Sequence, residues 1–272
     1  MPRLAGHRVE GLSVGGIETC IDLPELKLAF DIGRCPDAAV QRPTILFTHA
    51  HMDHMGGVAW HAATRSLRAL GPPTYVVPRE TEAAFEELFA AWRKLDRSDL
   101  PHRRIALGPG EQLDLGRGLI ARPFRSPHVV PCQGYALWSR KRKLRPELAG
   151  LPEEEIRRRR TELGEEVTVE VETAEIAFTG DTRIEILERE EVVRRARLLI
   201  LEVTFLDERV SVEECRAKGH VHLDEVVERA ELFENEAVLF THFSARYRRE
   251  EVLEILDRRL PPALRAKATA LL

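Results

Sequence analysis

The sequence predicts an α/β protein of four layers, in which two β-rich halves, each covered by helices, face one another around a shared site. Short apolar runs alternate with helical patterns in the first third of the 272 residues and again in the second half. In both halves the expected strands end at polar loops. Because no Pro- or Ser-rich linker separates the halves, we expect a single domain over residues 1–272.

The first half is expected to hold both strands and helices. Its expected strands are 26–32, 44–48 and 74–77, and its expected helices are 56–70 and 80–95. In the second of these helices the apolar residues Phe85, Phe89 and Trp92 recur at helical spacing, so we interpret them as core. Residues 105–140 are β-rich, with Gly and Pro at the turns.

The second half repeats this pattern after a charged tract. Its expected strands are 167–172, 176–179, 198–203 and 237–241, and its expected helices are 185–197, 224–233 and 250–259. We expect a charged insertion at about 139–163, because residues 139–160 contain nine Lys or Arg against four Glu. Such a tract is either a solvated helical face or a surface that contacts RNA phosphates.

Composition limits the class of protein. With 43% hydrophobic and 32% charged residues the chain can bury a sizeable core, and its formal net charge of −4 excludes a globally basic nucleic-acid coat. The four cysteines form no C-x-x-C pair, so we expect free thiols in a reducing compartment. We see no signal-peptide h-region and no apolar span of 18 residues, and we expect a cytoplasmic protein without a membrane partner.

A histidine-rich loop carries the strongest chemical signal. The run THAHMDHMGG places His49, His51, Asp53 and His54 within six residues, directly after an apolar strand. The two-residue period of extended chain puts His49 and His51 on one side, while Asp53 and His54 turn toward a neighbouring point, which suits two metal ions. A solvated loop is the alternative, but it gives no reason for this run to follow a buried strand. Without a metal, these groups would be costly to desolvate.

Three later strand ends offer further ligands: His128, Asp181 and His242. Taken alone, a strand-end Asp or His is more often a turn cap or a satisfied core residue. Their recurrence at corresponding strand ends, together with the histidine-rich loop, favours a shared metal site.

These residues carry a family resemblance that spans roughly residues 28–247. HAHMDH resembles the H-x-H-x-D-H motif of the metallo-β-lactamase superfamily. HVVPCQGY, FTGDT and THFSARY are similar to ribonuclease Z, the tRNA 3′-processing endonuclease, and in particular to its short plant and cyanobacterial type. The resemblance implies the αββα sandwich of that superfamily. The Gly/Pro-rich arm of many bacterial relatives has no counterpart here, so either the charged tract substitutes for it or tRNA recognition is weaker.

The resemblance also implies roles for individual residues. His49, His51 and His128 would hold a first Zn²⁺, and Asp53, His54 and His242 a second, with Asp181 bridging them and Mn²⁺ as the alternative metal. Asp53 would be the general base toward a shared water of lowered pKa.

The leaving 3′-oxygen would take its proton from His220, which Glu202 orients. Arg246 would contact a phosphate or form a structural ion pair. Of the remaining histidines, His222 is interpreted as facing solvent at a helix start, and the other three as surface residues: His7, His61 and His102.

The function implied is a zinc-dependent endoribonuclease that removes the 3′ trailer from precursor tRNA, acting as a homodimer. Two alternatives stay open from the sequence. One is a small-molecule phosphodiesterase or other metallohydrolase on the same fold, and the other is a noncatalytic RNA-binding protein that has lost turnover.

Overall fold

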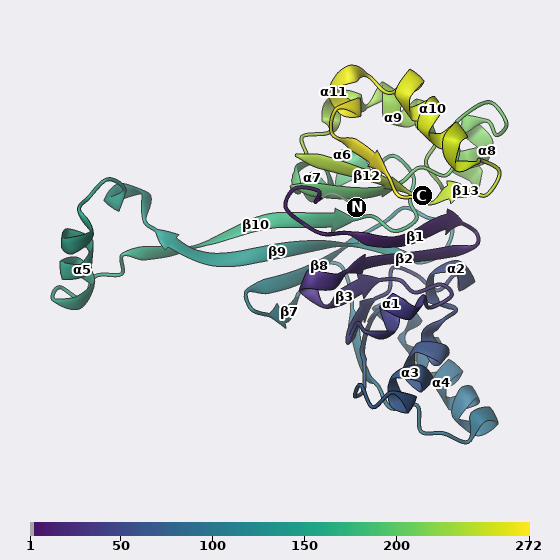
Figure 1. Ribbon diagram of the computed structural model, residues 1–272, viewed down its shortest axis with the longest axis horizontal. Coiled ribbons are helices and arrows are strands. Elements are labelled where there is room, and N and C mark those ends of the chain that lie inside the picture. The colour runs from purple at the N-terminus through teal and green to yellow at the C-terminus, as the bar shows by residue number, and fades with distance from the viewer. Residues whose placement is uncertain (1–2) are drawn as a thin grey trace.

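Two seven-stranded sheets pack face to face, with helices on their outer sides, in a computed structural model that describes residues 3–272 (Figure 1). The strand order is β13-β1-β2-β3-β4-β5-β6 in the first sheet and β14-β12-β11-β10-β9-β8-β7 in the second. The predicted four-layer α/β fold is therefore confirmed.

The first sheet is formed mainly by the N-terminal half. Its strands are β1 (Glu10–Gly15), β2 (Glu18–Leu23), β3 (Leu28–Phe30), β4 (Thr44–Leu46), β5 (Thr74–Pro78), β6 (Arg103–Leu107) and β13 (Phe243–Ser244). The helices of this half are η1 (Pro24–Leu26), α1 (Asp37–Val40), α2 (Met52–Met55), α3 (Val58–Leu67), η2 (Arg79–Thr81) and α4 (Glu82–Asp96). Strands β3 to β6 are parallel, so their carboxyl ends lie at one edge of the sheet.

The second sheet is formed by the C-terminal half. Its strands are β7 (Leu113–Gly116), β8 (Leu119–Arg125), β9 (Gln133–Leu144), β10 (Thr168–Phe178), β11 (Leu198–Glu202), β12 (Ala237–Thr241) and β14 (Ala268–Ala270). Its outer helices are α6 (Ile186–Arg189), α7 (Glu191–Arg195), α8 (Val212–Ala217), α9 (Leu223–Glu228), η4 (Ala230–Leu232), α10 (Arg249–Arg259) and α11 (Pro262–Arg265). Strands β10, β11, β12 and β14 are parallel.

The apolar layer between the sheets holds the two halves in place. Phe30 of the first sheet packs on Phe178 of the second, with ring centroids 5.0 Å apart, and both rings are buried. Burying such a side chain contributes about 1.5–3 kcal/mol. Because Phe30 and Phe178 stand near the carboxyl ends of β3 and β10, this contact fixes the two sets of strand-end loops against each other.

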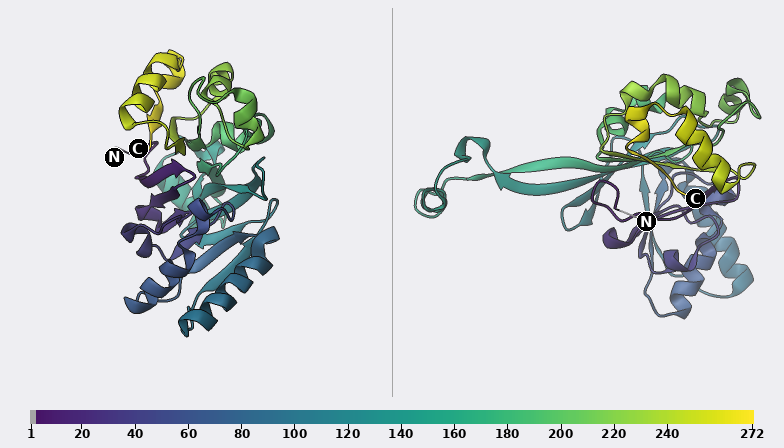
Figure 2. Two further views of the ribbon diagram at one scale, coloured as in Figure 1. Left: turned by 90° about the vertical axis from the view of Figure 1, so that its right-hand side faces the viewer. Right: turned by 45° about the horizontal axis from the view of Figure 1, so that its top comes forward.

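Strands β9 and β10 extend beyond the sheet as a two-stranded arm, which carries η3 (Pro146–Leu148) and α5 (Glu153–Thr161) at its far end (Figures 1 and 2). The charged tract expected at 139–163 lies in the outer part of β9, in η3 and in α5. The strands expected separately at 167–172 and 176–179 are one strand, β10, because its outer residues pair with β9 along the arm. A bulge between Ala174 and Ile176 explains the break in its sequence pattern.

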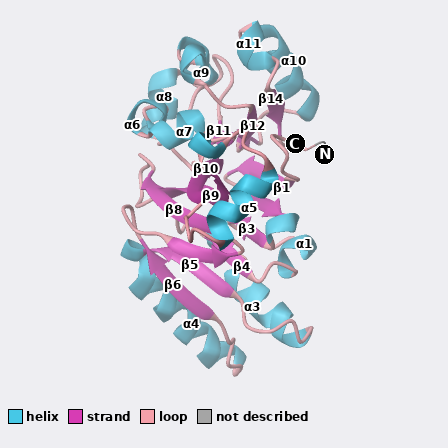
Figure 3. Ribbon diagram, turned by 90° about the vertical axis from the view of Figure 1, so that its left-hand side faces the viewer, coloured by secondary structure: helices cyan, strands magenta, loops and turns pink. Residues whose placement is uncertain are grey.

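Several local predictions were wrong. The helices expected at 185–197 and 224–233 are each broken into two short helices. Helix α4 lies beside β5 and β6 on the outer side of the first sheet (Figure 3). Its Phe85 and Phe89 are buried as expected, but Trp92 is 43% exposed. His61 is fully buried rather than on the surface, because the hydroxyl of Tyr75 and the carbonyl of Ala39 satisfy its two ring nitrogens at 2.8 and 3.1 Å.

Two other predictions about residue environment have clear outcomes. All four cysteines are free thiols, and all are buried. Over residues 3–272, no helix combines the length and the apolar character needed to cross a membrane.

Candidate metal centre

The seven predicted ligands converge at the edge where the strand-end loops of both sheets meet. His49 and His51 follow β4, while Asp53 and His54 lie on α2. The second sheet supplies His128 from the β8–β9 loop, Asp181 after β10 and His242 after β12. The structure therefore brings together residues that are separated by up to 193 positions in the chain.

The first cage contains His49, His51, His128 and Asp181, whose potential ligand atoms all lie within 4.8 Å of one another. His49 Nε2 is 3.0 Å from His51 Nδ1 and 3.7 Å from Asp181 Oδ2. His128 Nε2 is 4.0 Å from the same carboxylate oxygen. The family resemblance implies that the three histidines of this cage hold the first metal and that Asp181 contacts both metals.

The second cage contains Asp53, His54 and His242. His54 Nε2 and His242 Nε2 are 3.4 Å apart and lie 3.7 and 3.5 Å from Asp53 Oδ2. Asp181 faces both cages, because its Oδ1 is 3.3 Å from His54 Nε2 while its Oδ2 faces His49. It thus lies between the two cages.

The chemistry of these donors fits metal ions. Two nitrogens bound to one tetrahedral Zn²⁺ at about 2.0–2.1 Å are roughly 3.3 Å apart, close to the 3.0 and 3.4 Å between the paired imidazoles. Nδ1–H of His128 donates to the carbonyl of Gly219 at 2.8 Å, which leaves its buried Nε2 without a partner among residues 3–272. A buried nitrogen lone pair that faces a carboxylate is a natural metal ligand.

Gly219 is required for this contact. Its φ is +82°, and a Cβ there would lie 2.7 Å from His128 Nδ1. Any side chain at this position would displace the histidine.

A second layer of residues orients the imidazoles in the same way in both halves of the molecule. In the first half, Asp31 contacts His54 Nδ1 directly at 2.8 Å, and it accepts a 2.8 Å hydrogen bond from Thr48, whose hydroxyl is 3.0 Å from His49 Nδ1. Thr48 donates its hydroxyl hydrogen to the Asp31 carboxylate, so its hydroxyl oxygen is free to accept the Nδ1–H of His49. His49 therefore turns the lone pair of Nε2 into the cage.

The second half repeats this arrangement around Glu202. Its carboxylate contacts His220 Nδ1 at 2.8 Å and accepts a 2.6 Å hydrogen bond from Thr204, whose hydroxyl is 3.0 Å from His242 Nδ1. Asp31, Thr48 and Thr204 were not predicted as site residues. Asp31 follows a short apolar strand, as Asp181 does, and that shared position was the available signal.

Burial and charge set the protonation of the cage residues. Burial lowers the pKa of His49, His51 and His128, which keeps them neutral as metal ligation requires. Burial also disfavours the charged form of His54, but the carboxylates of Asp181 and Asp31 raise its pKa well above the usual value. We therefore expect metal binding to displace a proton from His54.

Asp53 is held as a carboxylate. Its Oδ2 accepts the backbone N–H of Gly16 at 2.9 Å. Burial opposes ionisation, but the hydrogen bond to His242 and the charge of His54 lower the pKa of Asp53 to about 2.

His220 lies between the cages, with its ring centroid 5.3 Å from those of both His128 and His242. Burial lowers its pKa, but the Glu202 charge and hydrogen bond reverse this and raise it to about 9. Both Glu202 oxygens also accept hydrogen bonds from Thr182, Thr204 and Val221. Because both carboxylate oxygens of Glu202 already accept hydrogen bonds, this residue is suited to orient His220 rather than to bind a metal.

Two other predicted positions lie near this group. Arg246 is exposed after β13, and its guanidinium is 5.8 Å from the ring centroid of Phe205, which is 6.4 Å from that of His220. No ion pair involves Arg246 within residues 3–272, so the structural ion pair considered for it is not formed. His222 does not face solvent: it is buried, and its Nδ1 accepts the N–H of Asp224 at the start of α9.

Known proteins resemble this chain in both sequence and fold. Residues 33–243 match the model of the beta-lactamase superfamily domain. The chain is 43% identical over 271 residues to tRNase Z TRZ1 of Arabidopsis thaliana, covering 99% of this chain and 96% of that protein. It is 42% identical over 253 residues to the chloroplastic tRNase Z TRZ2 of the same plant, covering 92% of this chain and 71% of that protein.

A solved structure agrees with these sequence matches. The crystal structure of the human tRNase Z short form superposes with a TM-score of 0.62 at 18% identity, over 88% of this chain and 93% of the human one. At this level of identity the superposition supports the fold.

Proposed function

The chain belongs to the tRNase Z family of the metallo-β-lactamase superfamily, and from this premise we propose that it is a zinc-dependent endoribonuclease that removes the 3′ trailer from precursor tRNA. The observation that carries the proposal is the pair of cages joined by Asp181 and flanked by the Glu202–His220 pair. A hydrolase of phosphodiesters needs both a site for the attacking water and a proton for the leaving oxygen.

We propose two Zn²⁺ per chain, with Mn²⁺ as an alternative. His49, His51 and His128 would hold one, Asp53, His54 and His242 the other, and Asp181 both. When bound, the metals supply Lewis acidity for the phosphate and a water of lowered pKa. Asp31, Glu202, Thr48 and Thr204 keep the imidazoles oriented, so that little rearrangement is needed on metal binding.

Asp53 and His220 divide the proton transfers. Asp53 is 13% exposed at its side chain, and one of its oxygens remains available to accept a proton from the attacking water. His220 is 16% exposed at its side chain, and Glu202 holds its Nδ1, so its Nε2–H is directed away from Glu202 and can protonate the departing ribose 3′-oxygen. In the metal-free protein, despite burial, the Glu202 carboxylate raises the pKa of His220 to about 9, which favours the protonated form that a proton donor needs.

We propose that the arm and Arg246 contact substrate phosphates. Helix α5 carries four consecutive arginines, residues 157–160, and lies far from the cages at the end of β9 and β10 (Figure 1). Contacts at such a distance would add affinity for a long RNA without affecting the chemistry at the cages.

The proposed cellular form is a cytoplasmic homodimer. The four free cysteines agree with a reducing compartment. Met52 on α2 and Trp60 on α3 are 78% and 66% exposed, and these large apolar side chains supply contact surface for a second subunit. Light scattering of the purified chain measures the subunit number.

Cleavage of a precursor tRNA transcript with end mapping tests the function. Protein loaded with zinc should cut directly after the acceptor stem and leave a 3′-hydroxyl. Asp53→Ala should abolish cleavage, while Asp37→Ala, whose side chain is 93% exposed on α1, should retain it. Hydrolysis of a small activated phosphodiester without RNA cleavage would instead indicate a small-molecule phosphodiesterase, and RNA binding without either activity would indicate a noncatalytic binder.

A further inference from the structure

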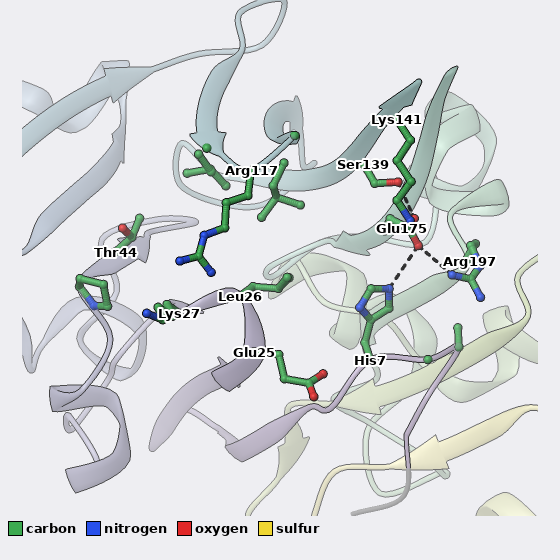
Figure 4. A pocket seen from close by; sticks show the side chains of 17 residues that line it. His7, Glu25, Leu26, Lys27, Thr44, Arg117, Ser139, Lys141, Glu175 and Arg197 are labelled. Carbon is green, nitrogen blue, oxygen red and sulfur yellow. Dashed lines mark hydrogen bonds and ion pairs between the residues drawn. The ribbon is translucent and has the colours of Figure 1, made fainter. Parts of the chain in front are cut away.

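A hollow lies at the edge of the sandwich opposite the metal centre, where β9 and β10 leave the sheet to form the arm (Figure 4). Its volume is about 490 Å³, within the range of small-molecule sites. It is lined by Thr44 at the start of β4 and by Lys141 of β9, whereas the cages lie after the end of β4 and before the start of β9. The eight residue-to-residue steps from Gln133 to Lys141 span roughly 27 Å of extended strand.

Three cations line this hollow without a carboxylate partner. Lys27, Arg117 and Lys141 are all exposed, and none forms an ion pair within residues 3–272. The acidic residues beside them are already neutralised, since Glu175 pairs with Arg197 at 2.8 Å and Glu25 pairs with Arg3. The hollow therefore has an excess of positive charge on a chain whose net charge is −4.

Arg117 is held in place at a conformational cost. It stands at the tip of the β7–β8 hairpin with φ of +54°, between Gly116 and Gly118, both also at positive φ. Glycine or asparagine is favoured in this conformation, so the arginine occupies it at a cost in backbone energy. Figure 4 shows the guanidinium directed into the hollow, on the side where Lys27 lies.

The remaining lining suits a ligand with an apolar body and hydrogen-bonding groups. Leu26, Leu115 and Leu119 are partly exposed and rest on the core between the sheets, which gives the hollow an apolar floor. The β10 bulge turns Glu175 inward, where it accepts hydrogen bonds from Ser139 at 2.6 Å and from Arg197 at 2.8 Å. His7 lies 3.3 Å from the same carboxylate.

We propose that this hollow binds a nucleoside monophosphate. The phosphate would lie against Arg117 and Lys27, whose cationic ends are on the same side of the hollow (Figure 4), because a dianion offsets cations that otherwise repel one another. The base would cover the leucine floor, and the sugar hydroxyls would meet the polar group around Glu175. This site is separate from the metal centre and does not depend on the proposed function.

Calorimetric titration of the intact chain with AMP tests the proposal. We expect saturable binding that weakens at least tenfold in Lys27→Gln/Arg117→Gln and is unchanged in Arg157→Gln/Arg160→Gln, which removes two exposed cations from α5 instead. Adenosine and inorganic phosphate should each bind at least tenfold more weakly than AMP. Binding should persist in His54→Ala, which disrupts the metal centre.

Arg117→Gly provides a second variant, which is not expected to destabilise the fold. It relieves the positive φ, so it should raise the melting temperature while weakening AMP binding at least tenfold. Equal AMP affinity in the wild type and the Arg117 variants would overturn the proposal. So would loss of binding in His54→Ala, an equal loss in the α5 control, or no heat of binding to the wild type.

Discussion

Replacing Glu202 by Gln is expected to lower the pKa of His220 in the metal-free protein from about 9 toward 6.5. Burial works in the same direction as the substitution, and the Glu202 carboxylate at 2.8 Å is the main opposing influence. The interval between 6.5 and about 9 corresponds to roughly 3 kcal/mol of interaction between the imidazolium and its surroundings. With its pKa near 6.5, the His220 side chain would be mostly neutral at pH 8 and would carry no proton to donate.

The sign of the accompanying stability change follows from linkage. The folded-state pKa of His220 lies above its unfolded value, so the stabilisation is fully present below about pH 6.5 and is lost as the pH rises through about 9. Over that window the metal-free wild type should lose up to roughly 3 kcal/mol more of its free energy of unfolding than Glu202→Gln does. Comparing the two proteins removes the contribution of other histidines.

Nuclear magnetic resonance titration of the His220 ring measures the pKa, and urea denaturation at pH 6 and 9.5 measures the stability. Glu214→Gln on the neighbouring helix α8 is the matched control, because Glu214 is exposed and pairs with Lys218 rather than with a histidine. A His220 midpoint that stays near 9 in Glu202→Gln would refute the assignment of Glu202 as its partner.

Three further predictions concern the cages, the core and the arm. Thr48→Val and Thr204→Val should each weaken zinc affinity roughly 10–100-fold in chelator competition, with the serine variants retaining it, because valine cannot accept from Nδ1–H; unchanged affinity would contradict the orienting role. Gly134→Ala should lower the free energy of unfolding by about 1–3 kcal/mol in urea, since its Cβ would lie 2.2 Å from the Phe124 ring; a neutral effect would show that the ring moves freely. Replacing the four arginines at 157–160 by glutamine should lower kcat/KM for precursor tRNA and flatten its salt dependence while leaving hydrolysis of a small phosphodiester intact; an equal loss on both substrates would exclude a role limited to RNA binding.

The candidate ligands that converge in the structure have signals that are local in the chain. His49 to His54 fall within one short segment after β4, and Asp181 and His242 each follow an apolar strand, so strand-end position brings them to one edge. The second layer lacks such a signal. Thr48 and Thr204 resemble any strand-end threonine until the carboxylate and the imidazole on either side of each are seen together.

The insertion at 139–163 and the strand at 167–172 were predicted, but the two-stranded form of the arm was not. Residues 168–172 pair with residues 140–144, and because both faces of that ribbon are largely solvated, the pattern shows no core face that would indicate the pairing. His61 was misplaced because its burial depends on the Tyr75 hydroxyl from another element, which sequence spacing does not reveal.

Anomalous diffraction at the zinc absorption edge from crystals of the zinc-loaded protein tests the central claim most directly. Two peaks should appear roughly 3.5–4 Å apart, one within reach of His49, His51 and His128 and the other within reach of Asp53, His54 and His242, with Asp181 contacting both. A single peak, or peaks elsewhere in the molecule, would contradict the two-metal site and the phosphodiester chemistry derived from it.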